Sequence, residues 1–305
     1  MAITLFSHAT CYRHLAGDDH PEQPARLSAI NDQLIRSGLE FVLQQRDANP
    51  AIKQQLYRAH SQLYVDDIYA KAPTEGYIWL DPDTQMMRHS LDAALYAAGA
   101  GIDAIELVLQ QPDQQAFCSV RPPGHHATRD QAMGFCIFNN VAIAALHALT
   151  QHGLERVAIV DFDVHHGNGT EDIVGGDERI LFCSSFQSAL YPYRDQQSGA
   201  ANVENLPLPA LCKPAQWREQ ILNHWLPRLN AFKPQLILVS AGFDGHREDD
   251  MAQFLLVEDD YQWIAQQLKQ LADQHCQGRI VAMLEGGYAL SALGRSVVAF
   301  LKGLM

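Results

Sequence analysis

The sequence lacks any cluster of lysine and arginine residues, and its 305 residues carry a formal net charge of -13. Because a nucleic-acid-binding protein normally has a basic face, no nucleic-acid partner is expected. An acidic surface mildly favours cationic ligands. No apolar run approaches the ~20 residues that span a bilayer, so no membrane partner is expected either. The first residues also lack the basic leader and apolar stretch of a signal peptide, and the cytoplasm is the expected compartment.

The sequence also lacks a CxxC pair, because its six cysteines are scattered along the chain. This spacing argues against both a disulfide framework and a thiolate zinc site. The cysteines are better interpreted as small buried hydrophobic residues in a reducing compartment. Histidine, by contrast, is abundant, with fourteen residues. Several histidines stand alone in the sequence and are expected to be surface or ordinary core residues, namely His8, His60, His89, His147, His152, His224 and His275.

Short apolar segments alternate with amphipathic ones along most of the chain. The apolar segments predict strands at 3–6, 116–120, 157–160, 179–184, 236–240 and 280–284. The amphipathic segments predict helices at 24–35, 90–109, 139–149, 217–229, 261–275 and 291–301, whereas 73–85 is predicted to be a loop. This alternation is typical of an α/β protein with a parallel sheet covered by helices on both faces. With no internal repeat or linker, residues 1–305 are predicted to form a single domain.

The stretch from Arg156 to Thr170, RVAIVDFDVHHGNGT, is the most informative. A buried apolar strand runs directly into acidic residues and histidines. If the extended conformation continues, Asp161, Asp163 and His165 point to the same side. Two neighbouring carboxylates repel each other unless a cation or a strong donor lies between them. A merely solvated loop is the less favoured alternative, because apolar residues interleave with the polar ones.

The other predicted strands also end in polar loops, and in open α/β sheets ligands bind beyond the carboxyl ends of the strands. The loop after 236–240 brings Asp244. Asp163, His165 and Asp244 form a plausible metal-binding set, because three protein ligands with one open position are typical of catalytic zinc sites. The same ligands would also suit Fe²⁺, Co²⁺ or Mn²⁺, so the identity of the metal stays open.

Two further loops supply groups for acid–base chemistry. His125 and His126 follow the strand at 116–120, and Tyr288 follows two glycines after the strand at 280–284. A metal ion lowers the pKa of bound water toward ~7, a histidine can move the proton, and a tyrosine can donate to a developing oxyanion. Together these groups predict hydrolysis of a carbonyl bond, most simply an amide. In isolation, the GGY segment is better interpreted as a glycine turn with a packed tyrosine.

Six segments, in this order along the chain, resemble the zinc-dependent histone deacetylase superfamily, which includes acetylpolyamine amidohydrolases and acetoin-utilisation-type proteins. They are HPEQPARL (20–27), RPPGHHA (121–127), GFCIFNN (134–140), DFDVHHGNGT (161–170), SAGFDGH (240–246) and EGGY (285–288). The wording of RPPGHHA and DFDVHHGNGT is most similar to the class II branch. The resemblance implies an arginase/deacetylase fold with a central parallel sheet of about eight strands.

The resemblance also implies roles for individual residues. The implied zinc ligands are Asp163, His165 and Asp244. His126 would be the general base and then the general acid, and His125 an electrostatic helper paired with Asp161. Tyr288 would polarise the substrate carbonyl. Asn168 stands where many relatives have an aspartate that would partner His126, and as a neutral group it should support the imidazolium less.

Substrate-binding and potassium-binding residues are implied in the same way. The acyl-lysine tunnel would be lined by Gly134, Phe135, Tyr191 and Met251, with the alternative that the two aromatic residues belong to the core. A structural potassium ion would be held by Asp161, by the backbone carbonyls of Asp163 and His165, and by Ser185 and Phe186.

Four questions stay open at this level. An arginase-like dinuclear ureohydrolase is disfavoured because Gly242 stands where a second aspartate would be needed. A catalytically weak acyl-lysine-binding protein is disfavoured because no catalytic residue is missing. The substrate could be an acyl-lysine protein or peptide, or an acetylated polyamine or other small amine, and an acidic loop at 18–22 is expected to attract cations to the tunnel rim. The oligomeric state cannot be read from the sequence.

Overall fold

The computed structural model describes residues 2–17, 19–110, 112–193 and 198–305. An eight-stranded sheet with the strand order β2-β1-β5-β10-β9-β6-β7-β8 lies at its centre, and every neighbouring pair of strands is parallel. The predicted α/β class with about eight parallel strands is therefore confirmed. The strands are β1 (Ala2–Ser7), β2 (Gln44–Asp47), β5 (Gln114–Cys118), β6 (Val157–Asp161), β7 (Ile180–Gln187), β8 (Val203–Leu208), β9 (Leu236–Ala241) and β10 (Ile280–Leu284).

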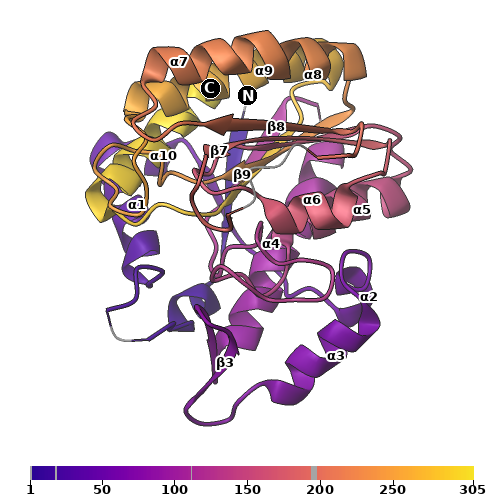
Figure 1. Ribbon diagram of the computed structural model, residues 1–305, viewed down its shortest axis with the longest axis vertical. Helices are drawn as coiled ribbons and strands as arrows, with labels where there is room; N and C mark the ends of the chain where they lie inside the picture. Colours follow the sequence, from indigo (N-terminus) through magenta and orange to yellow (C-terminus); the bar gives the residue numbers. More distant parts are fainter. Residues whose placement is uncertain (1, 18, 111, 194–197) are drawn as a thin grey trace.

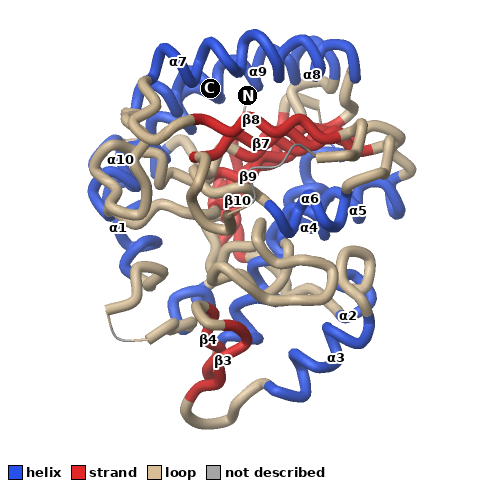
Figure 2. Tube along the Cα trace, in the orientation of Figure 1, coloured by secondary structure: helices blue, strands red, loops and turns tan. Residues whose placement is uncertain are grey.

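Helices cover both faces of this sheet, as Figures 1 and 2 show. Helices α1, α9 and α10 pack together on one face, and α4, α5 and α6 lie on the other. The helices are α1 (Ala25–Ser37), α2 (Lys53–Leu56), α3 (Gln62–Lys71), α4 (Ser90–Gln110), α5 (Asn140–His152), α6 (Asn168–Val174), α7 (Pro214–Gln220), α8 (Leu226–Phe232), α9 (Glu258–His275) and α10 (Leu290–Leu304). Shorter helical turns occupy Ala9–Arg13, Leu39–Phe41 and Ile221–Trp225. Among the described residues, no helix combines the length and the apolar composition that crossing a membrane requires.

The inner strands form because their side chains are apolar on both faces. All residues of β6, β7, β9 and β10 are buried, which suits a parallel sheet sandwiched between helix layers. The sequence predicts six of the eight strands and misses the two at the edges, β2 and β8. Strand β2 reads QQRD and all four residues are exposed, so it carries no hydrophobic signal and is held by its backbone pairing with β1.

A second, two-stranded sheet replaces the loop predicted at 73–85, and that prediction was wrong. Strands β3 (Tyr77–Asp81) and β4 (Thr84–Met87) form an antiparallel hairpin around Pro82 and Asp83. The aromatic and β-branched residues of β3, which reads YIWLD, are the signal that could have indicated it.

The parallel register aligns the carboxyl ends of the central strands. Asp161 at the end of β6 pairs with Ser184 on one side and Ser240 on the other. Leu284 at the end of β10 pairs with Ala241, and Met283 pairs with Cys118. The loops that follow these strands therefore start from one edge of the sheet, as the sequence predicts.

Candidate active site

Asp163, His165 and Asp244 lie together just beyond the ends of β6 and β9, and all three are buried. The Nδ1 atom of His165 is 3.1 Å from Asp163 Oδ1 and 3.1 Å from Asp244 Oδ2. Burial lowers the pKa of His165, but the hydrogen bonds to the two carboxylates outweigh it and raise this pKa to about 10. Burial and the neighbouring Asp163 raise the pKa of Asp244 to about 6. The two carboxylates therefore favour a positive charge at this position.

This donor set fits a divalent metal ion. Two carboxylate oxygens and one imidazole nitrogen lie within 4.8 Å of one another, and together they leave a further coordination position free, as catalytic zinc sites do. Glycines make room for them: a Cβ atom at Gly242 would collide with Asp163, and one at Gly286 would collide with Asp244. The crowding at Gly242 also leaves no space for the second aspartate that a dinuclear centre would need.

His125 and His126 lie beside this cluster with their ring centroids 4.0 Å apart. His125 Nδ1 is 2.9 Å from Asp161 Oδ2, and His126 Nδ1 is 2.7 Å from Asn168 Oδ1. Burial lowers the pKa of His125, but Asp161 and Asp163 outweigh it and raise this pKa well above its usual value. The two rings therefore sit in electrostatically different surroundings.

The surroundings of His126 shift its pKa in the opposite direction, downward. Burial, followed by the neighbouring His125 and His165, lowers the pKa of His126 well below its usual value. Its hydrogen bond to Asn168 partly opposes this shift. Two adjacent histidines whose pKa values are pushed apart can take different roles, one neutral and able to accept a proton and the other favouring the imidazolium.

Tyr288 is held by groups on both sides of its loop. The backbone N–H groups of Tyr288 and Ala289 donate to Asp249 Oδ2 over 2.6 and 2.9 Å. The guanidinium of Arg26 lies 4.9 Å from the centroid of the Tyr288 ring. Burial raises the pKa of Tyr288 well above its usual value, so its hydroxyl stays protonated and can donate a hydrogen bond.

A pocket of about 170 Å³ lies beside the candidate catalytic groups, and three of them line it. It is lined by Asp83, His126, Gly134, Phe135, His165, Tyr191, Met251 and Tyr288. All four residues expected to line the substrate tunnel are thus in the same pocket as the candidate catalytic groups. The rings of Phe135 and Tyr288 meet edge to face at 6.1 Å, and those of His126 and Tyr191 at 5.1 Å.

Asp83, for which the sequence predicted no role, lines this pocket from the turn of the β3–β4 hairpin. Its Oδ1 atom accepts a hydrogen bond from Gly134 N over 3.0 Å, so the hairpin is tied to the pocket wall. Burial and the nearby Asp81 raise the pKa of Asp83 to about 6. A carboxyl group from a distant hairpin can be placed in the pocket only by tertiary packing.

One acidic residue of the loop at 18–22 is not available for the expected attraction of cations at the tunnel rim. Glu22 is completely buried and forms hydrogen bonds with the guanidinium groups of Arg121 and Arg26. Burial raises the pKa of Glu22, but Arg121 and then His14 hold it well below its usual value. Asp18 lies outside the described residues. The charge of Glu22 is therefore neutralised inside the protein and is not available at the rim.

Asp161, at the end of β6, is the centre of the expected potassium site. Asp161 Oδ1 accepts from Asp163 N over 3.1 Å. Ser185 Oγ already accepts a hydrogen bond from the indole of Trp217 over 3.1 Å. Ser184 is the register partner of Asp161, and its buried Oγ has no hydrogen-bond partner among the described residues. Ser184 is therefore better suited than Ser185 to supply a hydroxyl ligand.

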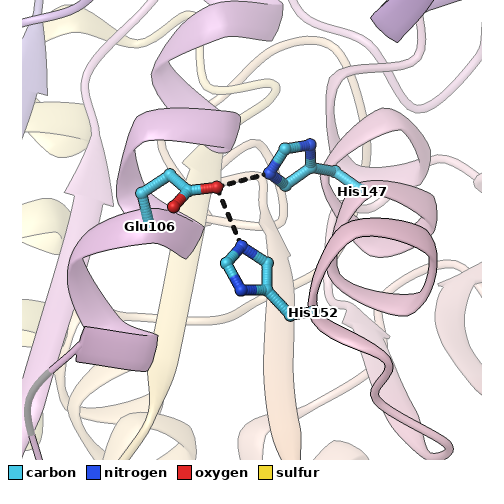
Figure 3. Close-up of side chains that lie close together, drawn as sticks. All are labelled: Glu106, His147 and His152. Atoms are coloured by element: carbon cyan, nitrogen blue, oxygen red, sulfur yellow. Dashed lines mark hydrogen bonds and ion pairs between the residues drawn. The ribbon is translucent and has the colours of Figure 1, made fainter.

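A second cluster of possible metal ligands lies elsewhere, between α4 and α5 (Figure 3). The Nε2 atoms of His147 and His152 are 2.7 and 2.8 Å from Glu106 Oε1, although both histidines stand alone in the sequence. Arg58 Nη1, from the turn after α2, is 2.6 Å from His147 Nδ1. Because a guanidinium only donates, Nδ1 accepts and Nε2 carries the proton that it donates to Glu106. That nitrogen has no free lone pair for a metal ion, and we interpret the cluster as a hydrogen-bonded tie between helices.

Comparisons with known proteins agree with this geometry. The model of the histone deacetylase domain matches residues 20–304. A histone deacetylase-like amidohydrolase of Pseudomonas aeruginosa is 35% identical, over 95% of this chain and 78% of its own. A probable deacetylase of Archaeoglobus fulgidus is 36% identical, over 95% of this chain and 82% of its own. The crystal structure of the HDA15 HD domain matches with a TM-score of 0.90 and 31% identity, covering 100% of this chain and 90% of that one. The chain therefore belongs to the histone deacetylase family of hydrolases.

Proposed function

We propose that the protein is a zinc-dependent amidohydrolase that removes acetyl or other acyl groups from amines. The observation that carries this proposal is the buried cluster Asp163, His165 and Asp244 lying beside a histidine pair whose pKa values are shifted in opposite directions. His165 of the cluster and His126 of the pair line the same pocket. Asp163, His165 and Asp244 would hold the metal ion. When bound there, the ion supplies Lewis-acid chemistry, which polarises a carbonyl group and lowers the pKa of water.

The chain's own residues would carry the proton transfers. His126, neutral because of its lowered pKa, takes a proton from the attacking water and later returns it to the leaving amine. His125, whose raised pKa favours the imidazolium, stabilises the negative charge that develops nearby. Tyr288 donates a hydrogen bond to the carbonyl oxygen as that oxygen gains charge. Amide and water are thereby converted into a carboxylate and an amine.

The substrate class is a cationic or lysine-like acylamine. Phe135 and Tyr191 give the pocket aromatic walls suited to an aliphatic stem, and Asp83 adds a carboxyl group to the lining. The formal net charge of -13 favours cationic partners in general. Both acyl-lysine peptides and acetylated polyamines meet these requirements.

We also propose a structural potassium ion at Asp161, with Ser184 Oγ in place of Ser185 as its hydroxyl ligand. The proposed compartment is the cytoplasm.

A substrate panel tests this function. The zinc-loaded protein would be assayed against acetyl-lysine peptides, longer acyl-lysine peptides and acetylpolyamines, with release of the free amine as the readout. Asp163→Asn is the matched inactive control, because it removes a ligand with little change in volume. We expect turnover of at least one class and its loss in the control. No turnover of any acylamine, or equal turnover by Asp163→Asn, would refute the proposal.

A further inference from the structure

Glu285 is a completely buried carboxylate to which the mechanism above assigns no role. It stands between the end of β10 and the two glycines that precede Tyr288. Its Oε2 atom accepts hydrogen bonds from the backbone N–H groups of Gly124 and His125 over 2.7 and 3.1 Å. Its Oε1 atom accepts from Ser240 Oγ over 3.1 Å. One carboxylate thus connects the loop that follows β5 with strand β9 and with the end of β10.

These contacts fix the backbone from which the two histidines project. The N–H of His125 is held by Glu285, and its carbonyl oxygen accepts from Thr170 N over 3.1 Å. The peptide groups around His125 are therefore anchored on both sides. Buried N–H groups that lose their acceptor are costly, so the loop would move to find another partner if the carboxylate were withdrawn.

The electrostatic surroundings of Glu285 match this structural role. Among the described residues, no lysine or arginine forms a salt bridge with its side chain. Burial raises the pKa of Glu285 to about 7, while the nearby His125 and the backbone N–H of Gly124 act to lower it. The carboxylate is therefore stabilised chiefly by the loop that it holds.

We propose that Glu285 is a positioning residue for the histidine pair. Its carboxylate oxygens hold the loop that carries His125 and His126 at the correct distance from the buried cluster of candidate metal ligands. This inference rests on the proposed hydrolase function. Reacting groups must be held closely, because a displacement of about 1 Å can cost on the order of 100-fold in rate. The residue acts through the backbone of the histidine loop and does not contact the substrate.

Two substitutions separate position from charge. Glu285→Gln keeps the length of the side chain and an oxygen that can face Gly124 and His125, but removes the charge. Glu285→Asp keeps the charge but withdraws the oxygens by one methylene. We expect kcat of Glu285→Asp to fall by about 10- to 100-fold with KM changed less than about twofold, whereas Glu285→Gln recovers to within about threefold of the wild type. Ser240→Ala, which removes only the third contact, serves as the matched control and should also stay within about threefold.

Nuclear magnetic resonance of the imidazole rings provides a readout that does not depend on turnover. The ring signals of His125 and His126, assigned with single His→Asn variants, should shift in Glu285→Asp and stay near their wild-type positions in Glu285→Gln. Zinc content and melting temperature confirm that folded proteins are compared. An active Glu285→Asp, or an inactive Glu285→Gln, would overturn the positioning role. A wild type without turnover would refute the proposed function instead, while the ring signals would still decide the role of Glu285.

Discussion

The clusters around His165 and around His147 both place imidazole nitrogens within about 3 Å of carboxylate oxygens, yet the surrounding charges are opposite. Two buried carboxylates, Asp163 and Asp244, face the single ring of His165. At the other cluster one half-exposed carboxylate, Glu106, faces two rings. The first arrangement needs another positive charge, and the second already contains one in Arg58.

The hydrogen-bond partners of each ring decide whether that histidine can bind a metal ion. Metal-binding histidines usually donate their second N–H to an acceptor, which leaves the other nitrogen free to coordinate. Arg58 reverses this order at His147, because it donates to Nδ1 and leaves the proton on the nitrogen that faces Glu106. Proximity of ligand-type residues therefore does not by itself identify a metal site. The charged group that contacts the other nitrogen of each ring also decides whether the ring can coordinate a metal ion.

The largest expected effect comes from removing a ligand of the buried cluster. Asp244→Asn should lower the rate by more than about 100-fold, because changes to groups that only support ligands already cost roughly 10- to 100-fold. The variant should also lose its zinc, measured by metal analysis after dialysis. Glu106→Gln is the matched substitution at the other cluster and should keep both. If Asp244→Asn retained zinc and activity, the buried cluster would not be the metal site.

Removing the Tyr288 hydroxyl should have the next largest effect. Tyr288→Phe should lower kcat by about 100- to 1000-fold, because it deletes one preorganised donor to the developing oxyanion. The zinc content should not change, since the hydroxyl is not part of the ligand set. Steady-state kinetics on the best substrate of the panel measures this loss. Full activity in the variant would remove Tyr288 from the mechanism.

Zinc titration of the metal-free protein tests the difference between the clusters directly. We expect one tightly bound ion per chain in the wild type and in His152→Ala, with activities within about twofold of each other because surface pairs contribute little. Two ions in the wild type but one in His152→Ala would show that the tie between α4 and α5 binds metal. Two ions in both proteins would instead indicate a dinuclear active centre.

The smallest expected effect is the acid sensitivity of the tie. Burial holds the pKa of His147 below its ordinary value of 6.5, so unfolding takes up a proton when the pH lies below that value. The stability of the wild type relative to His147→Asn should therefore fall as the pH is lowered from about 6.5. Because His152 and Glu106 are partly exposed, the total change should stay within about 1 kcal/mol. Urea unfolding at several pH values measures it, and an increase in relative stability at low pH would contradict the assignment.

Much of the fold could be predicted because the inner strands carry their information locally. Strands β6, β9 and β10 are continuous apolar runs followed at once by polar residues, so both their existence and the side of the sheet on which the site lies follow from the pattern. The edge strands β2 and β8 could not be predicted in this way. Strand β2 is exposed throughout and is defined by backbone pairing with β1, which leaves little trace in its side chains. Strand β8 is mostly buried, but polar residues and a proline interrupt its apolar run, VENLPL.

The short helix α6 shows the same limit near the site. It begins at Asn168, in a segment whose glycines suggest a turn. A Cβ atom at Gly169 would collide with the backbone of Ala127, so close packing against the histidine loop explains that glycine. Local composition suggests a turn here, whereas tertiary packing favours a helix in which the side chain of Asn168 contacts His126.

Residue types and their spacing along the chain were enough to predict the family, the parallel sheet and the residues that could hold a metal ion. The pairing of charged groups across the molecule emerged with the folded structure. Folding placed Asp83 in the pocket, neutralised Glu22 with two arginines, joined Glu285 to the histidine loop, and set Arg58 behind His147. Electrostatic interactions depend on distance and burial in space, and residues far apart in sequence acquire both only when the chain folds.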